Sequence, residues 1–295
     1  MKKPVLKIIL LLGSLLAIAL GVALLFPSKP LPPPKPLPNQ NGFTIALSAA
    51  GTLTNSGDYF TAGPEELKPI VAANSNALQT VRAAFSNEWR VPLSILDPTL
   101  SNHLNELSHL KQLAHAFSVE GRLAEIENDP DTAARDYLDS IEVGIRSAHG
   151  GVLIDGLVSL AMENIGAKNL QTTVPRLKSS TCREIAQSLE HLDAGREAWP
   201  EIMNTEREWS RRAFPGLRYR LQAFFMRRSL ATGIKKAGLK FEKQQTELRQ
   251  LILQLAARAY ELDKGEAPKA ANDLVPDYLK AIPQNPTTGL ELPYP

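Results

Sequence analysis

A long uncharged apolar run near the N-terminus constrains this chain more than any other feature. From Ile8 to Phe26 there are 19 residues without a charge, and Ser14 is the only polar residue among them. A helix of this length spans about 28 Å, close to the thickness of the hydrocarbon core of a bilayer. We therefore expect residues 1–26 to form a short tip and a transmembrane anchor. The alternative is a signal peptide cleaved after Ala17-Ile18-Ala19, although the apolar run continues beyond that point.

The charges that flank this run favour an exported body. Lys2, Lys3 and Lys7 precede the uncharged run, while Lys29 and Lys35 follow it. Positive charge concentrates on the cytoplasmic side of membrane spans, so the bias favours a cytoplasmic N-terminus and an exported C-terminal domain. The sequence has no second span of this kind, and we therefore predict a single-pass protein of the cell membrane with a signal-anchor.

A proline-rich segment follows the apolar run. Pro27 to Pro38 holds seven prolines in twelve positions, a composition that favours the extended polyproline II conformation. At about 3.1 Å per residue, the segment holds the next domain up to about 37 Å from the bilayer. We interpret residues 27–42 as a spacer. The alternative is a ligand for an aromatic groove on a partner protein.

Charge is distributed unevenly over the rest of the chain. The sequence carries 33 Lys and Arg against 31 Asp and Glu, a net charge of +2. There is no acid from Trp209 to Phe241, and this stretch holds nine basic residues: Arg211, Arg212, Arg218, Arg220, Arg227, Arg228, Lys235, Lys236 and Lys240. Two interpretations stay open. The stretch is either a helix pair whose basic side chains pair with acids of the same domain, or a surface for anionic lipid or an anionic envelope polymer. Nucleic acid is not expected as a partner in an exported compartment.

The body of the sequence has the start and stop signals of helices. Four sites combine an N-cap residue with an early proline or acid: Gly63-Pro64, Asp97-Pro98, Asp129-Pro130 and Thr181 to Glu184. A stripe of apolar residues at helical spacing runs from Leu248 to Leu262 and stops at Lys264-Gly265. No alternating run is long enough for a sheet, although Phe43 to Leu53 is compatible with an extended segment. We predict an all-α domain of about eight helices over residues 43–264.

One part of this domain resembles a known repeat. Over residues 117–140, large and small residues alternate around a turn at 128–130: Phe117, Gly121, Ala124, Ala133, Tyr137 and Ser140. This spacing resembles a tetratricopeptide hairpin, although no further copy follows at the family's period of roughly 34 residues. The resemblance implies two helices that approach closely at their small residues.

The C-terminal tail carries a second resemblance. Its residues are Gly265, Pro268, the segment from Asp273 to Leu279, Ile282-Pro283, Pro286, Gly289, Leu292 and Tyr294. They resemble the tail of type II secretion pseudopilins, in which a long helix is followed by a short helix and an irregular loop. The likeness implies that residues 265–295 form such a tail packed on the domain. The prepilin motif of that family is not in place, because Gly42-Phe43-Thr44 lies after the apolar run, so pilus assembly is not implied.

The whole layout has a third resemblance. The phrases from Leu67 to Asn74 and from Glu120 to Glu125, together with the tail, are similar to an uncharacterised family of single-pass, membrane-anchored bacterial helical proteins. This likeness covers most of the exported body. It implies a shared architecture and no activity.

Few residues are candidates for chemistry. His103, His109 and His115 are six residues apart, which scatters them around a helix, so we expect solvated or capping histidines and no metal site. Cys182 is the one cysteine; we expect a packed thiol there, the alternative being a reactive one at a helix start. Five acids surround the turn at 128–130: Glu120, Glu125, Glu127, Asp129 and Asp131. A pair of them would suit a glycan hydrolase, but helix capping and solvation also account for them.

These features predict a non-catalytic protein-interaction or scaffold module of the cell envelope. No catalytic residue, cofactor or metal site is assigned. The alternatives are an envelope-glycan hydrolase that uses a carboxylate pair, and a secretion-system accessory suggested by the tail. The expected partners are the membrane, a protein that the sequence does not identify, and an anionic lipid or envelope polymer at the basic residues of 209–241.

Overall fold

The computed structural model describes residues 33, 35–54, 62–94, 100–215 and 217–294, and for residues 217–230 it describes the helical backbone alone. The transmembrane anchor predicted for residues 1–26 and the first part of the spacer lie outside these ranges. Among the described residues, no helix is both long enough and apolar enough to cross a membrane.

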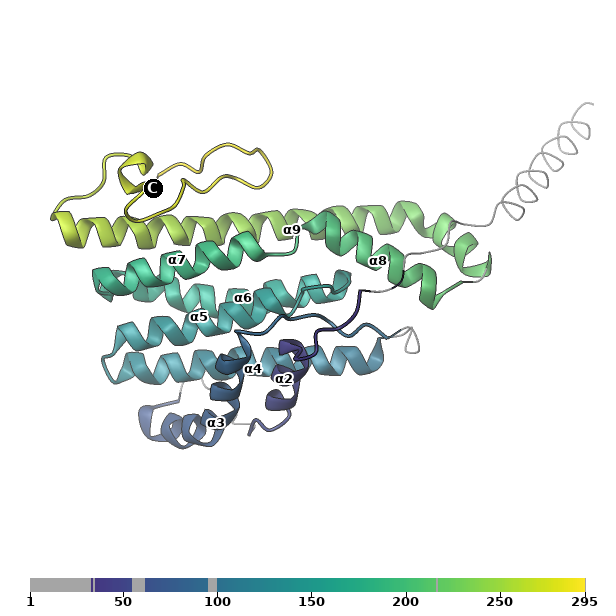
Figure 1. Ribbon diagram of the computed structural model, residues 1–295, viewed down its shortest axis with the longest axis horizontal. Helices are drawn as coiled ribbons and strands as arrows, with labels where there is room; N and C mark the ends of the chain where they lie inside the picture. Colours follow the sequence, from purple (N-terminus) through teal and green to yellow (C-terminus); the bar gives the residue numbers. More distant parts are fainter. Residues whose placement is uncertain (1–32, 34, 55–61, 95–99, 216, 295) are drawn as a thin grey trace, which may run out of the picture. The chain divides into compact units, whose positions relative to one another are not determined.

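The described part of the chain is built from helices and has no β-strand, which confirms the all-α prediction (Figure 1). Eight α-helices are described: α2 (Gly42–Ala50), α3 (Pro64–Ala84), α4 (Ser101–Ile126), α5 (Pro130–Arg146), α6 (Leu153–Thr173), α7 (Ser179–Gly195), α8 (Trp199–Ala213) and α9 (Leu217–Lys264). Two short 3-10 helices accompany them: η1 (Val174–Arg176) and η2 (Ala271–Leu274). All of them belong to one compact unit, Leu37–Pro295.

The segment 43–53 begins as a helix, which corrects the expectation of an extended segment. Asn41 caps α2, because its Oδ1 accepts a hydrogen bond from the backbone N–H of Phe43 at 3.1 Å. Phe43, Ala46 and Ala50 are buried and recur at intervals of three and four residues. Such spacing places them on one face of a helix, and burial of that face stabilises α2.

Two helix starts lie where the sequence predicts them. α3 begins at Pro64 after Gly63. α5 begins at Pro130, and the carboxylate of Asp129 accepts a hydrogen bond from the backbone N–H of Thr132 at 3.1 Å. In both cases the signal is local, since the capping residue and the early proline are neighbours in the chain.

Of the two other predicted helix starts, one is wrong and one lies outside the described residues. The capping box predicted at Thr181 is wrong, because α7 begins two residues earlier at Ser179 and Thr181 is buried. The backbone N–H of Lys178, just before α7, donates to the carboxylate of Asp131 on α5 at 3.2 Å. A side chain from another helix therefore satisfies the start of α7. The start predicted at Asp97-Pro98 lies outside the described residues, and α4 is described from Ser101.

α4 and α5 are consecutive helices that pack against each other at small residues. A Cβ atom added at Gly121 would come within 2.6 Å of the Tyr137 ring. Ala133 is fully buried in the same contact, and the Ser140 hydroxyl donates to the Ala114 carbonyl at 2.9 Å. The residues that resemble a repeat hairpin thus form a tightly packed helix pair.

α6 packs on α5 through two glycines, one on each helix. A Cβ added at Gly166 would lie 2.4 Å from the Tyr137 carbonyl oxygen, and one added at Gly144 would lie 2.5 Å from the Glu163 backbone nitrogen. Neither helix tolerates a larger residue at these positions without moving apart. α5 is therefore held between α4 and α6, and α7 also contacts it.

α7 and α9 lie along each other and form a further layer (Figure 1). The apolar stripe predicted from Leu248 is buried as far as Ala259, and α9 ends at Lys264 before Gly265, whose φ is +77°. Leu262, the last residue of the predicted stripe, is 43% exposed. The hydroxyl of Ser179, the first residue of α7, contacts the Ala259 carbonyl, so Leu262 lies beyond the start of α7.

The C-terminal tail folds back on α7 and α9. Four of its apolar residues are buried in the same cluster as these helices: Leu274, Tyr278, Leu279 and Leu292. The Tyr278 ring lies 5.5 Å from the Tyr260 ring of α9, and its hydroxyl donates to Asp263 at 3.1 Å. The short helix of the tail is the 3-10 helix η2, and the rest is irregular apart from one bridge between Gln284 and Glu291.

Candidate functional site

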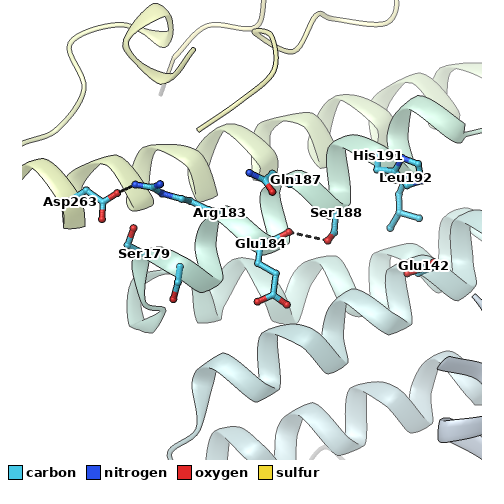
Figure 2. A pocket seen from close by; sticks show the side chains of 10 residues that line it. Glu142, Ser179, Arg183, Glu184, Gln187, Ser188, His191, Leu192 and Asp263 are labelled. Carbon is cyan, nitrogen blue, oxygen red and sulfur yellow. Dashed lines mark hydrogen bonds and ion pairs between the residues drawn. The ribbon is translucent and has the colours of Figure 1, made fainter. Parts of the chain in front are cut away.

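A groove of about 940 Å³ lies along α7 and is open to solvent (Figure 2). α5 contributes Glu142 to the groove and α9 contributes Asp263, while α7 supplies the other lining residues. These are Ser179, Ser180, Arg183, Glu184, Gln187, Ser188, His191 and Leu192. The floor of the groove is therefore one face of a single helix.

The amphipathic sequence of α7 explains why this floor is polar. Five residues that line the groove follow the period of a helix, because successive ones are one, three or four positions apart. They therefore share one face of α7: Ser180, Glu184, Gln187, Ser188 and His191. The opposite face holds apolar residues buried in the core: Cys182, Ile185, Ala186 and Leu189. Burial of the second face leaves the first face pointing away from the core.

The charged residues of α7 in the groove are paired with neighbouring helices. Arg183 reaches Asp263 of α9 and forms an ion pair with it, as Figure 2 shows, and it also lies 4.5 Å above the centre of the Tyr278 ring. Glu184 accepts two hydrogen bonds from Arg135 of α5, at 2.9 and 2.8 Å. This contact with Arg135 lowers the pKa of Glu184.

Glu142, on the α5 side of the groove, is also paired. It accepts a hydrogen bond from Arg146 Nε at 2.6 Å. Burial raises the pKa of Glu142, and the charge of Arg146 opposes that effect. Each acid that lines the groove thus has an arginine partner. The side chains left to meet a ligand are mainly hydrogen-bonding groups, namely Ser180, Gln187 and His191 among others.

These groups are suited to binding. Hydroxyl, amide and imidazole groups each donate and accept hydrogen bonds. Cys182 is fully buried below the floor, and burial raises its pKa to about 12, so the expectation of a packed thiol is confirmed. Across the described ranges, no group of three or more His, Cys, Asp or Glu residues is placed to hold a metal ion.

The five acids predicted as candidates for a carboxylate pair lie outside the groove. Three of them, near the turn, have structural partners. Asp129 caps α5, Asp131 lies 2.8 Å from the Lys178 ammonium, and Glu127 lies 3.6 Å from Lys68. Capping and ion pairing therefore account for these three acids.

The fourth acid, Glu125, joins three helices. Its carboxylate accepts hydrogen bonds from the Tyr137 hydroxyl of α5 at 2.9 Å and from the Thr173 hydroxyl of α6 at 2.7 Å. The contact helps to raise the pKa of Tyr137, after the larger effect of burial. Glu125 thus fixes the packing of α4 on its two neighbours.

The fifth acid, Glu120, belongs to a cluster around Arg82 of α3. Arg82 lies 2.6 Å from Glu120, 2.8 Å from Asp136 and 2.6 Å from Asp139. Burial raises the pKa of Asp136 to about 8, and the charge of Glu120 adds to that effect. Burial also raises the pKa of Asp139 to about 6, against the charge of Arg82. Three carboxylates share one guanidinium, so one of them holds a proton near neutral pH.

Of the three histidines on α4, His103 corrects the expectation of a solvated or capping residue. It is buried, with Nε2 2.6 Å from Asp155 of α6 and Nδ1 3.0 Å from Glu106. Burial lowers its pKa, but the hydrogen bonds and charges of Asp155 and Glu106 outweigh that effect and raise the pKa to about 9. His109 is exposed, and His115 is partly buried with a lowered pKa because of that burial. The six-residue spacing separates them as predicted.

The basic stretch from 209 to 241 covers the end of α8 and the first half of α9. Arg218, Arg220, Arg227 and Arg228 lie where only the helical backbone is described. Arg212 lies 3.9 Å from Glu208 one turn earlier. Four others are exposed, and none of them forms an ion pair with a described acid: Arg211, Lys235, Lys236 and Lys240. Within the described residues, internal pairing therefore holds for Arg212 alone.

Two features of the structure are not among the predictions from the sequence: the polar face of α7 and the Arg82 cluster. The first carries a readable signal, because polar residues follow the helical period between apolar ones from Ser180 to His191. The second has none, since Arg82 meets its acids across 38 to 57 positions of the chain. The packing of α3 on α4, and of α4 on α5, brings them together.

Comparison with known proteins adds no relative. No protein-family model matches this chain, and no curated protein or solved structure is significantly similar to it. The resemblances of the hairpin, the tail and the whole layout therefore stay predictions from the sequence. The case for a function rests on the groove along α7, on the ion pairs and on the pattern of charges.

Proposed function

We propose that this chain is a membrane-anchored, non-catalytic interaction module, and that the groove along α7 binds an extended segment of a partner protein. One observation carries the proposal. The groove presents a row of polar hydrogen-bonding side chains, while each acid that lines it is held by an arginine. Such a surface offers partners to the backbone N–H and C=O groups of a bound polypeptide, which need them when water is excluded.

The character of the groove supports a polypeptide over a small molecule. Small-molecule sites are concave and mostly apolar, with a few polar groups that fix orientation. This groove is open along α7, and most of the side chains that line it are polar, such as Ser180, Gln187 and Ser188. A ligand that lies along it makes many weak polar contacts, which suits a chain segment.

The anchor and the spacer supply the rest of the proposal. They come from the sequence, in the apolar run from Ile8 to Phe26 and the seven prolines after it. An extended spacer of this length lets the domain reach up to about 37 Å from the bilayer. A module of this kind acts by holding a partner near the membrane of the cell envelope.

The two alternatives have less support. A carboxylate-pair hydrolase needs two acids that face each other across an open cleft, and the five candidate acids, from Glu120 to Asp131, serve capping and helix packing. The secretion-system accessory rests on the likeness of the tail. That idea fails if deletion of residues 266–295 leaves every partner association intact.

The groove is tested by filling it. Ser188→Trp places a large ring on the floor, and Ser108→Trp, at an exposed serine of α4, is the matched control. Full-length chains are crosslinked in cells and purified. We expect the protein recovered with the wild type and the control to fall about tenfold with Ser188→Trp, as for a loss of about 1.4 kcal/mol. Circular dichroism confirms that both variants fold. Equal recovery with all three chains would contradict the proposal.

A further inference from the structure

The first half of α9 carries an exposed cationic face, formed by Lys235, Lys236, Leu239 and Lys240. The three lysines are exposed, and Leu239 between them is 55% exposed although it is a large apolar residue. The other side of the same turns is buried, where the Phe241 ring packs against α8. The cationic face is therefore turned away from the core.

No described acid neutralises this face. Among the described side chains in the middle of α9, the one lysine that forms an ion pair is Lys243, which lies 3.3 Å from Glu247, one turn further along. The sequence has no acid from Trp209 to Phe241, and the next acid along α9, Glu242, accepts a hydrogen bond from the Thr287 hydroxyl at 2.8 Å. Three lysines without acidic partners give this surface a positive potential that attracts anions.

The last residues of the spacer, Leu37 to Asn41, belong to the compact unit and lie close to the end of α8. The Asn41 side chain donates to the Arg90 carbonyl at 2.6 Å, and the Trp209 indole donates to the Ser94 carbonyl at 3.1 Å. Arg90 and Ser94 are four residues apart. The chain from Leu37 to Asn41 therefore meets the domain beside α8, where the basic stretch begins.

We infer that the cationic face binds the anionic headgroups of a lipid bilayer, the same bilayer in which residues 8–26 are predicted to be anchored. Lysine side chains suit headgroup phosphates, and an exposed leucine among them suits the boundary with the acyl chains. An anionic polymer matches the lysines but offers nothing apolar to Leu239. The inference rests on the membrane anchor of the proposed function and is independent of the groove.

The test uses the full-length chain in lipid nanodiscs. Leu239→Cys is labelled with the fluorophore NBD, whose emission shifts to the blue in an apolar environment; Cys182 is fully buried and stays unlabelled. Discs of anionic phosphatidylglycerol are compared with discs of neutral phosphatidylcholine. Two variants are built on this chain. The first replaces Lys235, Lys236 and Lys240 by Gln. The control replaces three other exposed lysines by Gln: Lys111, Lys168 and Lys269.

We expect a blue shift in anionic discs and none in neutral discs. Each lysine at an anionic surface strengthens binding about fivefold, so the first triple variant should weaken docking about 100-fold and abolish the shift. The control should keep it. High salt should remove the shift, because the Debye length at 1 M is about 3 Å.

Three results would overturn the inference: no shift in anionic discs, the same shift in both triple variants, or a response to soluble polyglutamate without one to the discs. A failure of the anchor is recognised separately. In that case the chain does not co-elute with neutral discs, while a functional cationic face still retains it on anionic discs at low salt.

Discussion

The side chains of Glu163 on α6 and of Arg196 after α7 are both buried, with their charged groups 2.9 Å apart. Arg82 and its three acids, and His103 with Asp155, are similar cases of a charge taken from water and matched across helices. Removal of one partner from such a pair leaves an unmatched buried charge, which is strongly destabilising. At this scale, single side chains specify which helices pack together.

The His103 pair should make stability depend on pH. Burial opposes its charge, but Asp155 and Glu106 raise the folded pKa to about 9, above the value of about 6.5 for an unfolded chain. The pair therefore stabilises the fold fully below about pH 6.5, and this contribution is lost as pH rises through about 9. We expect His103→Gln to lower the unfolding free energy by up to about 3 kcal/mol at pH 6 and by little at pH 10.

Urea unfolding of the purified chain, followed by tryptophan fluorescence, measures this difference. His109→Gln, at an exposed histidine on the same helix, is the control and should leave the pH dependence of the wild type unchanged. If the difference in unfolding free energy between His103→Gln and the wild type is the same at pH 6 and pH 10, the proposed role of His103 is wrong.

At the scale of helices, the close contact between α5 and α6 depends on glycine. A Cβ at Gly166 would lie 2.4 Å from the Tyr137 carbonyl oxygen, whereas one at Gly233 of α9 meets nothing within 4 Å. We expect Gly166→Ala to destabilise the chain by about 1–3 kcal/mol through overpacking. Gly233→Ala should stabilise it by up to about 1 kcal/mol, because alanine is the better helix former. Thermal unfolding measures the stability of both variants. If Gly166→Ala proves more stable than the wild type, α5 and α6 are not in close contact.

The tail is a second element whose packing is testable. Tyr278 is buried, its ring lies against that of Tyr260 at a tilt of 55°, and its hydroxyl donates to Asp263. We expect Tyr278→Ala to lower the free energy of unfolding by about 3–5 kcal/mol, because it leaves a cavity where the ring packs between the tail and α9. Tyr278→Phe removes only the hydroxyl and should cost about 1 kcal/mol. The midpoint of urea unfolding measures both, and equal costs for the two variants would place the stabilisation in the hydrogen bond and not in the packing.

The sequence predicts those elements whose signals are local. Asp129-Pro130 predicts the start of α5, and Lys264-Gly265 predicts the end of α9, because cap and helix are adjacent in the chain. The start of α7 depends on Asp131, 47 residues from Lys178, and no local pattern reveals such a contact. The groove is an intermediate case. Its polar floor follows the helical period of α7, but its sides come from α5 and α9.

At the scale of the whole molecule, the groove and the cationic face follow each other along α9. One end of the groove meets α9 at Asp263, 23 residues after Lys240 (263 − 240). The other end is next to Asp193, which accepts hydrogen bonds from Gln245 and Arg249 of α9. At 1.5 Å per residue, the groove therefore lies between about 8 and about 35 Å beyond Lys240 along the helix axis. The two proposed surfaces use different residues, so a bilayer and a bound segment do not compete for the same side chains.

The most direct test of the groove places a photo-crosslinking amino acid at Gln187, on its floor. Gln112, an exposed glutamine on α4, is the matched control position. Full-length chains are irradiated in cells, and adducts are resolved by mass. The account predicts a discrete protein adduct from Gln187 that is absent from Gln112 and is lost when Ser188→Trp fills the groove. Equal adducts from both positions, or an adduct that survives Ser188→Trp, would contradict the claim that α7 forms the binding site.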